Sequence, residues 1–166
     1  FDSLGRPMDV GNKSKPLAAQ VIIFSPNGTR FAYPIQRAGK DLVVVDQTTY
    51  DFGSGSGFVF SPDSKRFAYI ATRKTPQGLR KSVIVDGVDV QGLDEVKGDA
   101  LHFSSDSKHI AYVSFSKGEW RVTVDGTPGP PFQEIQNFQF DATGSRFGYI
   151  GRKTAGKSEI SWVPVI

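Results

Sequence analysis

Few residues of this chain have the types and spacing that catalysis or metal binding needs. The two histidines, His102 and His109, belong to no His-x-x-x-His or Glu-x-x-His pattern. The run Gly53–Gly57 resembles a nucleophile elbow, but Gly55 stands where the nucleophilic serine would be. Asp86–Asp89 lacks the further ligands and the closing Glu of a calcium loop. The chain has no cysteine, which excludes thiolate catalysis and Cys-based zinc sites. We therefore expect a protein that is not an enzyme and that holds no cofactor or metal.

The charged residues are compatible with recognition of an acidic protein partner. The net charge is only +3, but half of the 20 Lys and Arg residues gather in a few segments, where we expect only Glu119 to oppose them. The candidate partner-binding residues are Arg37, Lys40, Arg73, Lys74, Arg80, Lys81, Lys117, Trp120, Arg152, Lys153 and Lys157. Nucleic acid is not expected, because Phe115 and Trp120 are the only aromatic residues in these segments. The alternative is that these cations serve solubility alone.

The elements that must position these cations come from a ten-residue repeat. Its copies begin at Phe24, Phe60, Phe103 and Phe140. The second copy reads Phe-Ser-Pro-Asp-Ser-Lys-Arg-Phe-Ala-Tyr, which is typical of a strand, a tight turn and a second strand. Large and small apolar residues alternate after the turn, so both faces of the second strand should be covered. We expect the four leading Phe residues to be buried at equivalent places between sheets.

A second strand-like element follows each copy of the repeat. β-Branched residues lead into an Asp-Gly-type turn, and a further short run comes next. These runs, read as the fourth strand D, are Tyr50–Phe52, Leu93–Val96 and Phe132–Ile135. A period of about forty residues built from short strands is typical of β-propeller blades. The sequence predicts an all-β propeller with four blades of four antiparallel strands A to D, alone or as part of a larger ring.

The blades should span about residues 20–53, 54–97, 98–136 and 137–166, after an N-terminal segment of residues 1–19. Strand B is expected over Arg30–Tyr33, Arg66–Ile70, His109–Val113 and Arg146–Ile150. In such a fold the B–C loops project from one face of the disc. The candidate cations lie in these loops, so we expect one basic face.

The second copy, followed by Val83-Ile84-Val85-Asp86-Gly87, resembles the WD40-like (PD40, TolB-type) β-propeller repeats of bacterial proteins. The resemblance covers roughly residues 20–166, and it implies the propeller fold. That family includes scaffolds and substrate gates, so the resemblance implies no single activity. We expect a binding or scaffold module that mediates protein–protein interaction. The alternatives are a gating or substrate-binding domain of a larger hydrolase and a structural subunit of a multi-protein complex.

The ends of the chain carry two further expectations. Phe1–Leu4 resembles a strand D, and the fourth repeat ends after a predicted strand C at Glu159–Val163, so the N-terminus is a candidate to complete the last blade. The four blades close alone, form an eight-bladed ring with a second chain, or belong to a longer propeller. No run of the sequence is long and apolar enough for a membrane span. The chain begins with Phe1 rather than Met, so we expect a processed or trimmed piece that has lost any upstream signal. With the bacterial resemblance, this favours the periplasm or cell surface and leaves the cytoplasm open.

Overall fold

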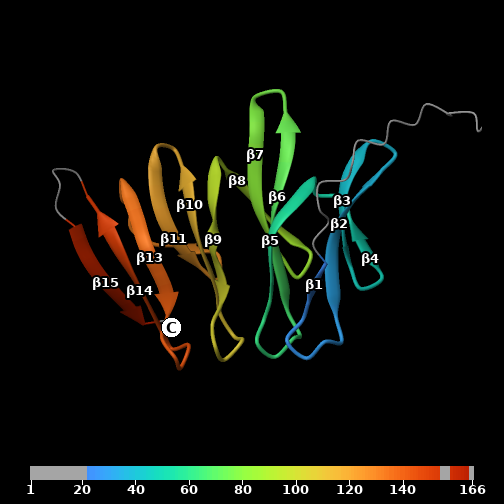
Figure 1. Ribbon diagram of the computed structural model, residues 1–166. Coiled ribbons are helices and arrows are strands. Elements are labelled where there is room, and N and C mark those ends of the chain that lie inside the picture. The colour runs from blue at the N-terminus through green and yellow to red at the C-terminus, as the bar shows by residue number, and fades with distance from the viewer. Residues whose placement is uncertain (1–21, 154–157, 165–166) are drawn as a thin grey trace, which may run out of the picture.

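Four antiparallel sheets stand side by side in a row in the computed structural model, which describes residues 22–153 and 158–164 (Figure 1). These residues contain strands and turns and no helix. Neighbouring sheets pack face to face, and each connects to the next along the chain. This is the arrangement of β-propeller blades, and it confirms the predicted fold class.

Each blade is a meander in chain order. Blade 1 contains β1 (Ile23–Phe24), β2 (Phe31–Arg37), β3 (Lys40–Val45) and β4 (Thr48–Tyr50). Blade 2 contains β5 (Ser54–Phe60), β6 (Phe67–Thr75), β7 (Gly78–Val85) and β8 (Val88–Leu93). Blade 3 contains β9 (Glu95–Phe103), β10 (Ile110–Ser116), β11 (Glu119–Val124) and β12 (Thr127–Pro128). Blade 4 contains β13 (Glu134–Phe140), β14 (Arg146–Arg152) and β15 (Ser158–Pro164).

The second strand of every blade lies where the repeat predicts it, although it runs further toward the B–C turn. Strand D differs from the prediction. The Asp-Gly turns send the chain straight back, so β8 begins at Val88 and β12 at Thr127. In the predicted segments Leu93–Val96 and Phe132–Ile135, the first residue pairs with strand C of its own blade, and the rest leads into β9 and β13, the first strands of the next blades. The predicted segment Tyr50–Phe52 overlaps β4 only at Tyr50. The closing strand predicted at Phe1–Leu4 lies outside the described residues.

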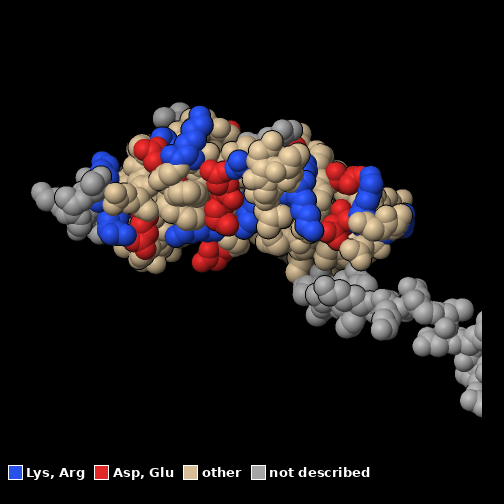
Figure 2. Space-filling model, turned by 90° about the horizontal axis from the view of Figure 1, so that it is seen from above, with Lys and Arg blue, Asp and Glu red and all other residues tan. Residues whose placement is uncertain are grey.

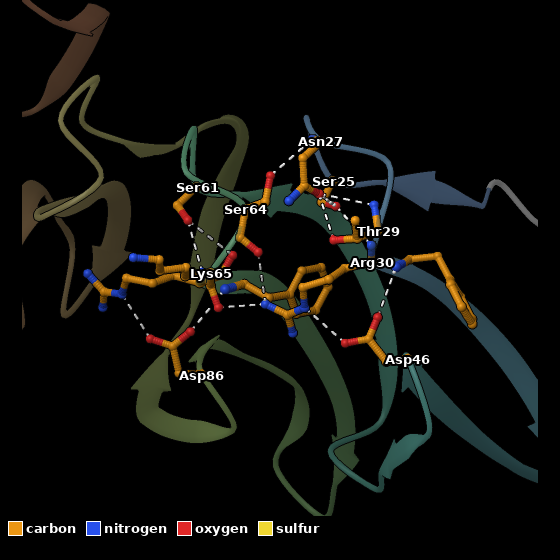
Figure 3. Close-up of polar contacts among 12 residues, drawn as sticks. Ser25, Asn27, Thr29, Arg30, Asp46, Ser61, Ser64, Lys65 and Asp86 are labelled. Carbon is orange, nitrogen blue, oxygen red and sulfur yellow. Dashed lines mark hydrogen bonds and ion pairs between the residues drawn. The ribbon is translucent and has the colours of Figure 1, made fainter.

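The Ser-Pro-Asp sequence of the repeat forms a tight A–B turn held by side chains (Figure 3). In blade 1 the Ser25 hydroxyl donates to Asn27 Oδ1 at 2.9 Å and accepts the Arg30 amide at 3.0 Å. Blade 3 repeats this pattern with its own serine and aspartate. In blade 4 the first residue of the turn is Asp141, whose carboxylate accepts the Arg146 amide at 3.1 Å. The carboxylate therefore takes over the acceptor role of the serine hydroxyl.

The core consists of three layers, one between each pair of neighbouring blades. In blade 2, Phe67 and Tyr69 pack on blade 1, whereas Ala68 and Ile70 pack on blade 3. We call the side of a blade that carries its large aromatic residues the leading face and the other side the trailing face. Phe60, Phe103 and Phe140 lie half-buried on leading faces, against the preceding blade. The prediction of a buried Phe24 is wrong, because no described blade precedes blade 1 and this ring is 62% exposed.

An arginine directly before strand B joins each of the first two blades to its successor (Figure 3). Arg30 Nε lies 2.9 Å from Asp46 Oδ2 in the C–D turn of its own blade, and Nη1 donates to the Lys65 carbonyl of blade 2 at 2.6 Å. The same guanidinium lies over the Phe60 ring, 5.2 Å from its centroid. Arg66 makes the corresponding contacts with Asp86, with the Lys108 carbonyl at 2.8 Å and with the Phe103 ring at 5.1 Å. We call this arrangement the arginine clamp.

Candidate interaction surface

The B–C hairpins of the blades point to the same side of the row, at the top of Figure 1, and together form what we call the hairpin face. The β6–β7 hairpin is the longest and stands above its neighbours. Strand pairing continues to the Thr75–Gly78 pair, so Arg73, Lys74, Arg80 and Lys81 are strand residues rather than loop residues. Their side chains are therefore positioned by a regular ladder.

Five of the nine candidate cations within the described residues are paired with carboxylates. The pairs are Lys40 with Asp51, Arg73 with Asp89, Arg80 with Asp94, Lys81 with Glu95, and Arg152 with Glu134. The hydrogen bond with Asp51 raises the pKa of the Lys40 ammonium. Contacts with Gln136 and then with Arg152 lower the pKa of Glu134. The expectation that only Glu119 opposes these cations is thus wrong.

Figure 2, which looks down on this side, shows Lys and Arg side chains interspersed with Asp and Glu rather than a continuous basic surface. Within the part of the chain that the structure describes, Arg37, Lys74 and Lys117 are the candidates without an ion pair or a ring partner. Lys153 lies over the Phe132 ring, 5.6 Å from its centroid, and Lys157 lies outside the described residues. Half-buried Trp120 contacts Phe115 and the Lys97 ammonium, so it supports the surface from beneath.

The tip of the β6–β7 hairpin carries a residue that the sequence reasoning missed. Leu79 is 63% exposed, and in the strand register it pairs with Lys74. This apolar side chain thus stands exposed near the end of a projecting hairpin, beside a cation without a carboxylate partner. Its sequence signal is an isolated Leu between the turn residue Gly78 and the polar run Arg80–Ser82.

The first strands of blades 3 and 4 line a hollow of about 330 Å³ bordered by Lys97, Asp99, Gln136 and Asn137. Lys97 Nζ donates to the Ile135 carbonyl across the two blades. His102 Nε2 lies 2.8 Å from the Asp99 carbonyl, so this histidine has a structural contact. His109 likewise contacts Asp125, with 2.7 Å between Nδ1 and Oδ2.

No group of three or more potential metal ligands occurs among the residues in ranges 22–153 and 158–164. The same residues include no helix of the length and apolarity needed to span a membrane.

Comparison with solved structures supports the fold. The β-propeller domain of the Trilobed protease from Pyrococcus furiosus, described as having an open velcro topology, superposes with a TM-score of 0.52 at 13% identity. The match covers 86% of this chain and 53% of that domain. This likeness, together with the stacked blades, defines the chain as a protein of the β-propeller class.

Two further structures superpose less closely. TolB from Acinetobacter baumannii gives a TM-score of 0.47 at 12% identity, over 88% of this chain and 41% of TolB. A protein from Bacteroides uniformis described as a 6-phosphogluconolactonase homologue gives 0.42 at 17% identity, over 87% of this chain and 54% of that one. The chain thus spans about half the length of the solved structures that it matches. No protein-family model and no curated protein matches this sequence.

Proposed function

We propose that this chain is a non-catalytic β-propeller module that binds another protein through its hairpin face. The observation that carries the proposal is the tip of the β6–β7 hairpin, where exposed Leu79 stands beside Lys74. Binding energy at protein interfaces is concentrated in a few anchoring side chains surrounded by weaker contacts. A projecting hairpin with one apolar anchor and one free cation fits that pattern.

The charges of this face support an acidic partner, through fewer residues than the sequence suggested. Arg37, Lys74 and Lys117 remain to attract a negative surface, and such attraction raises the association rate and weakens with salt. The paired cations have another role. Arg73 bonds Asp89 and the Phe52 carbonyl and lies over the Phe52 ring, so it ties the upper part of the β6–β7 hairpin to β8 and to the segment before β5.

The experiment compares partner capture by the wild-type chain and by the double variant Lys74→Glu, Leu79→Ala. Both positions are at the hairpin tip, so the far-UV circular dichroism spectrum should stay unchanged. The partner recovered by the wild type should be lost from the double variant, most clearly at low salt. Lys108→Glu, an exposed charge reversal in the A–B turn of blade 3 on the opposite side, is the matched control. Equal recovery from all three proteins refutes the proposal.

The likeness to the propeller domain of a protease favours one alternative, in which the module gates or binds substrate for a larger hydrolase. The two functions differ in what the partner is. In the alternative, the protein captured, or a domain joined to this chain in its natural gene, has hydrolase activity. For a binding or structural subunit, the partner recovered lacks such activity.

The resemblance of the repeat to bacterial PD40 proteins supports a site of action in the periplasm or at the cell surface. Fractionation of the producing cells tests this directly. The protein is expected in the extracytoplasmic fraction, and recovery with cytoplasmic markers refutes it.

A further inference from the structure

The junction of blades 1 and 2 and the junction of blades 2 and 3 share one kind of contact, whereas at the junction of blades 3 and 4 His109 stands in place of the arginine and contacts Asp125. The arginine clamp sends Arg30 onto Phe60 and Arg66 onto Phe103, and in both cases the guanidinium also bonds a carbonyl of the next blade's A–B turn. These arginine side chains are 27% and 31% exposed. Each contact therefore combines a ring on the leading face of one blade with a cation from the blade before it.

The two ends of the row each carry half of such a contact. Phe24, the equivalent of Phe60 and Phe103, is 62% exposed and has no arginine over it among the described residues. Arg146, the equivalent of Arg30 and Arg66, is 65% exposed, and its nearest carboxylate is Asp141 of its own turn at 3.5 Å. Phe24 belongs to blade 1 and Arg146 to blade 4, so these two residues lie at opposite ends of the row (Figure 1).

A second contact between A–B turns shows the same incomplete ends. The Asn27 amide donates to Ser64 Oγ at 3.1 Å, and the Asp63 amide donates to Ser107 Oγ at 3.0 Å. If the leading Phe is counted as position 1, the backbone amide at position 4 of one repeat donates to the side chain at position 5 of the next repeat. At the ends of the row, position 4 of blade 4 is Thr143, which is exposed. Position 5 of blade 1 is Gly28, where an added Cβ would have nothing within 4 Å.

The apolar surfaces at the two ends also match. Blade 1 presents Phe24 and Phe31 on its leading face, the side that inside the row packs on a preceding blade. On β14 of blade 4, Phe147 and Tyr149 pack on blade 3, so Gly148 and half-buried Ile150 lie on the trailing face. A small residue opposite a large ring is the pairing seen inside the row, where Ala32 packs against the layer that contains Phe60.

We propose that the leading face of blade 1 binds the trailing face of blade 4 in a second copy of this chain. Arg146 of one copy lies over Phe24 of the other and donates to the carbonyl of Thr29, the equivalent of Lys65 and Lys108. Because each chain carries both halves, two copies satisfy both ends at once and form a closed pair of eight blades related by a two-fold axis. The hairpin faces of both copies then lie on one side of the ring.

Engineered cysteines test this contact in the full 166-residue chain, which has no cysteine of its own. In the proposed pair, Gly28→Cys of one copy faces Thr143→Cys of the other. Gly28 has a φ of 73°, and the equivalent serines Ser64 and Ser107 tolerate nearly the same value of 66°. Mild oxidation of a mixture of the two single variants should give a covalent pair at twice the 18.1 kDa chain mass.

The matched control replaces Gly28→Cys by Gly118→Cys, at the tip of the β10–β11 hairpin on the other side of the row. The Gly28/Thr143 mixture should cross-link at least about tenfold faster than the control mixture. Adding Phe24→Ala and Arg146→Ala should remove that advantage while the far-UV spectrum stays unchanged, since both side chains are exposed. Light scattering of the unmodified chain should give the mass of two copies. Equal cross-linking rates, a single-chain mass or an open-ended series of larger species each overturns the proposal.

Discussion

Replacing Arg66 by Ala should destabilise the protein far more than its partly exposed position suggests. This side chain is 31% exposed, yet it forms a polar link between blades 2 and 3. It bonds Asp86 in its own blade, donates to the Lys108 carbonyl and covers the Phe103 ring. The substitution removes all three contacts and leaves the Asp86 carboxylate with the Phe67 amide as its remaining donor.

The expected loss follows from the size of each contact. A hydrogen bond from a charged group contributes about 1.5–3 kcal/mol, and a partly exposed cation–π contact about 0.5–1 kcal/mol. The ion pair with Asp86 is exposed enough to add little. Since solvent weakens all of these contacts, we expect a net loss of about 2 kcal/mol in the free energy of unfolding.

Urea unfolding followed by circular dichroism measures this loss, with Arg37→Ala as the matched control. Arg37 is exposed and has no ion pair within the described strands, so its replacement should change the free energy of unfolding by less than about 0.5 kcal/mol. A double-mutant cycle with Phe103→Leu should isolate a coupling of about 0.5–1 kcal/mol between ring and guanidinium. If Arg66→Ala costs no more than Arg37→Ala, the clamp does not join the blades.

Three more predictions concern the core and the turns. Gly151→Ala should cost about 1–3 kcal/mol in a denaturant melt, because its Cβ would lie 2.3 Å from the Phe132 ring, whereas Gly98→Ala, which meets nothing within 4 Å, should be nearly neutral. Tyr69→Phe should keep or slightly raise the melting temperature, because among the described residues its buried hydroxyl has no hydrogen-bond partner and burial raises its pKa. Hydrogen bonds from a serine hydroxyl and from a backbone amide of its own turn lower the pKa of Asp63. The stability that this carboxylate contributes is therefore present above about pH 4 and is lost as the pH falls further. Asp63→Asn should make the free energy of unfolding depend less on pH at the acid end.

The sequence predicts strands B and C and the A–B turns well, because their determinants are local. The alternation of Phe67 with Ala68 determines which face of β6 packs on blade 1 and which packs on blade 3. The serine and aspartate of each turn make contacts within about six residues along the chain. The short run Leu93–Val96 is different. It is apolar enough for any strand, and only the pairing of β8 with β7 shows that it joins two blades.

The charge of the hairpin face could not be predicted, because it depends on pairing across strands. Arg73 meets Asp89 and Arg80 meets Asp94 only after β6, β7 and β8 align, with a register shift between Lys81 and Val83. Counting cations along the chain locates them on the correct hairpins but overestimates their combined field. The exposure of Phe24 was unpredictable for a similar reason, since it depends on whether another blade precedes it.

Site-specific photo-crosslinking in the producing cells tests the binding role of the hairpin face most directly. A photoreactive amino acid in place of Leu79 should form a covalent adduct with one defined protein, and adding Lys74→Glu should reduce the yield. The same amino acid in place of Lys108, on the opposite side of the row, should form no such adduct. Absence of an adduct at Leu79, or the same adduct at both positions, would contradict the assignment of the hairpin face as the binding surface.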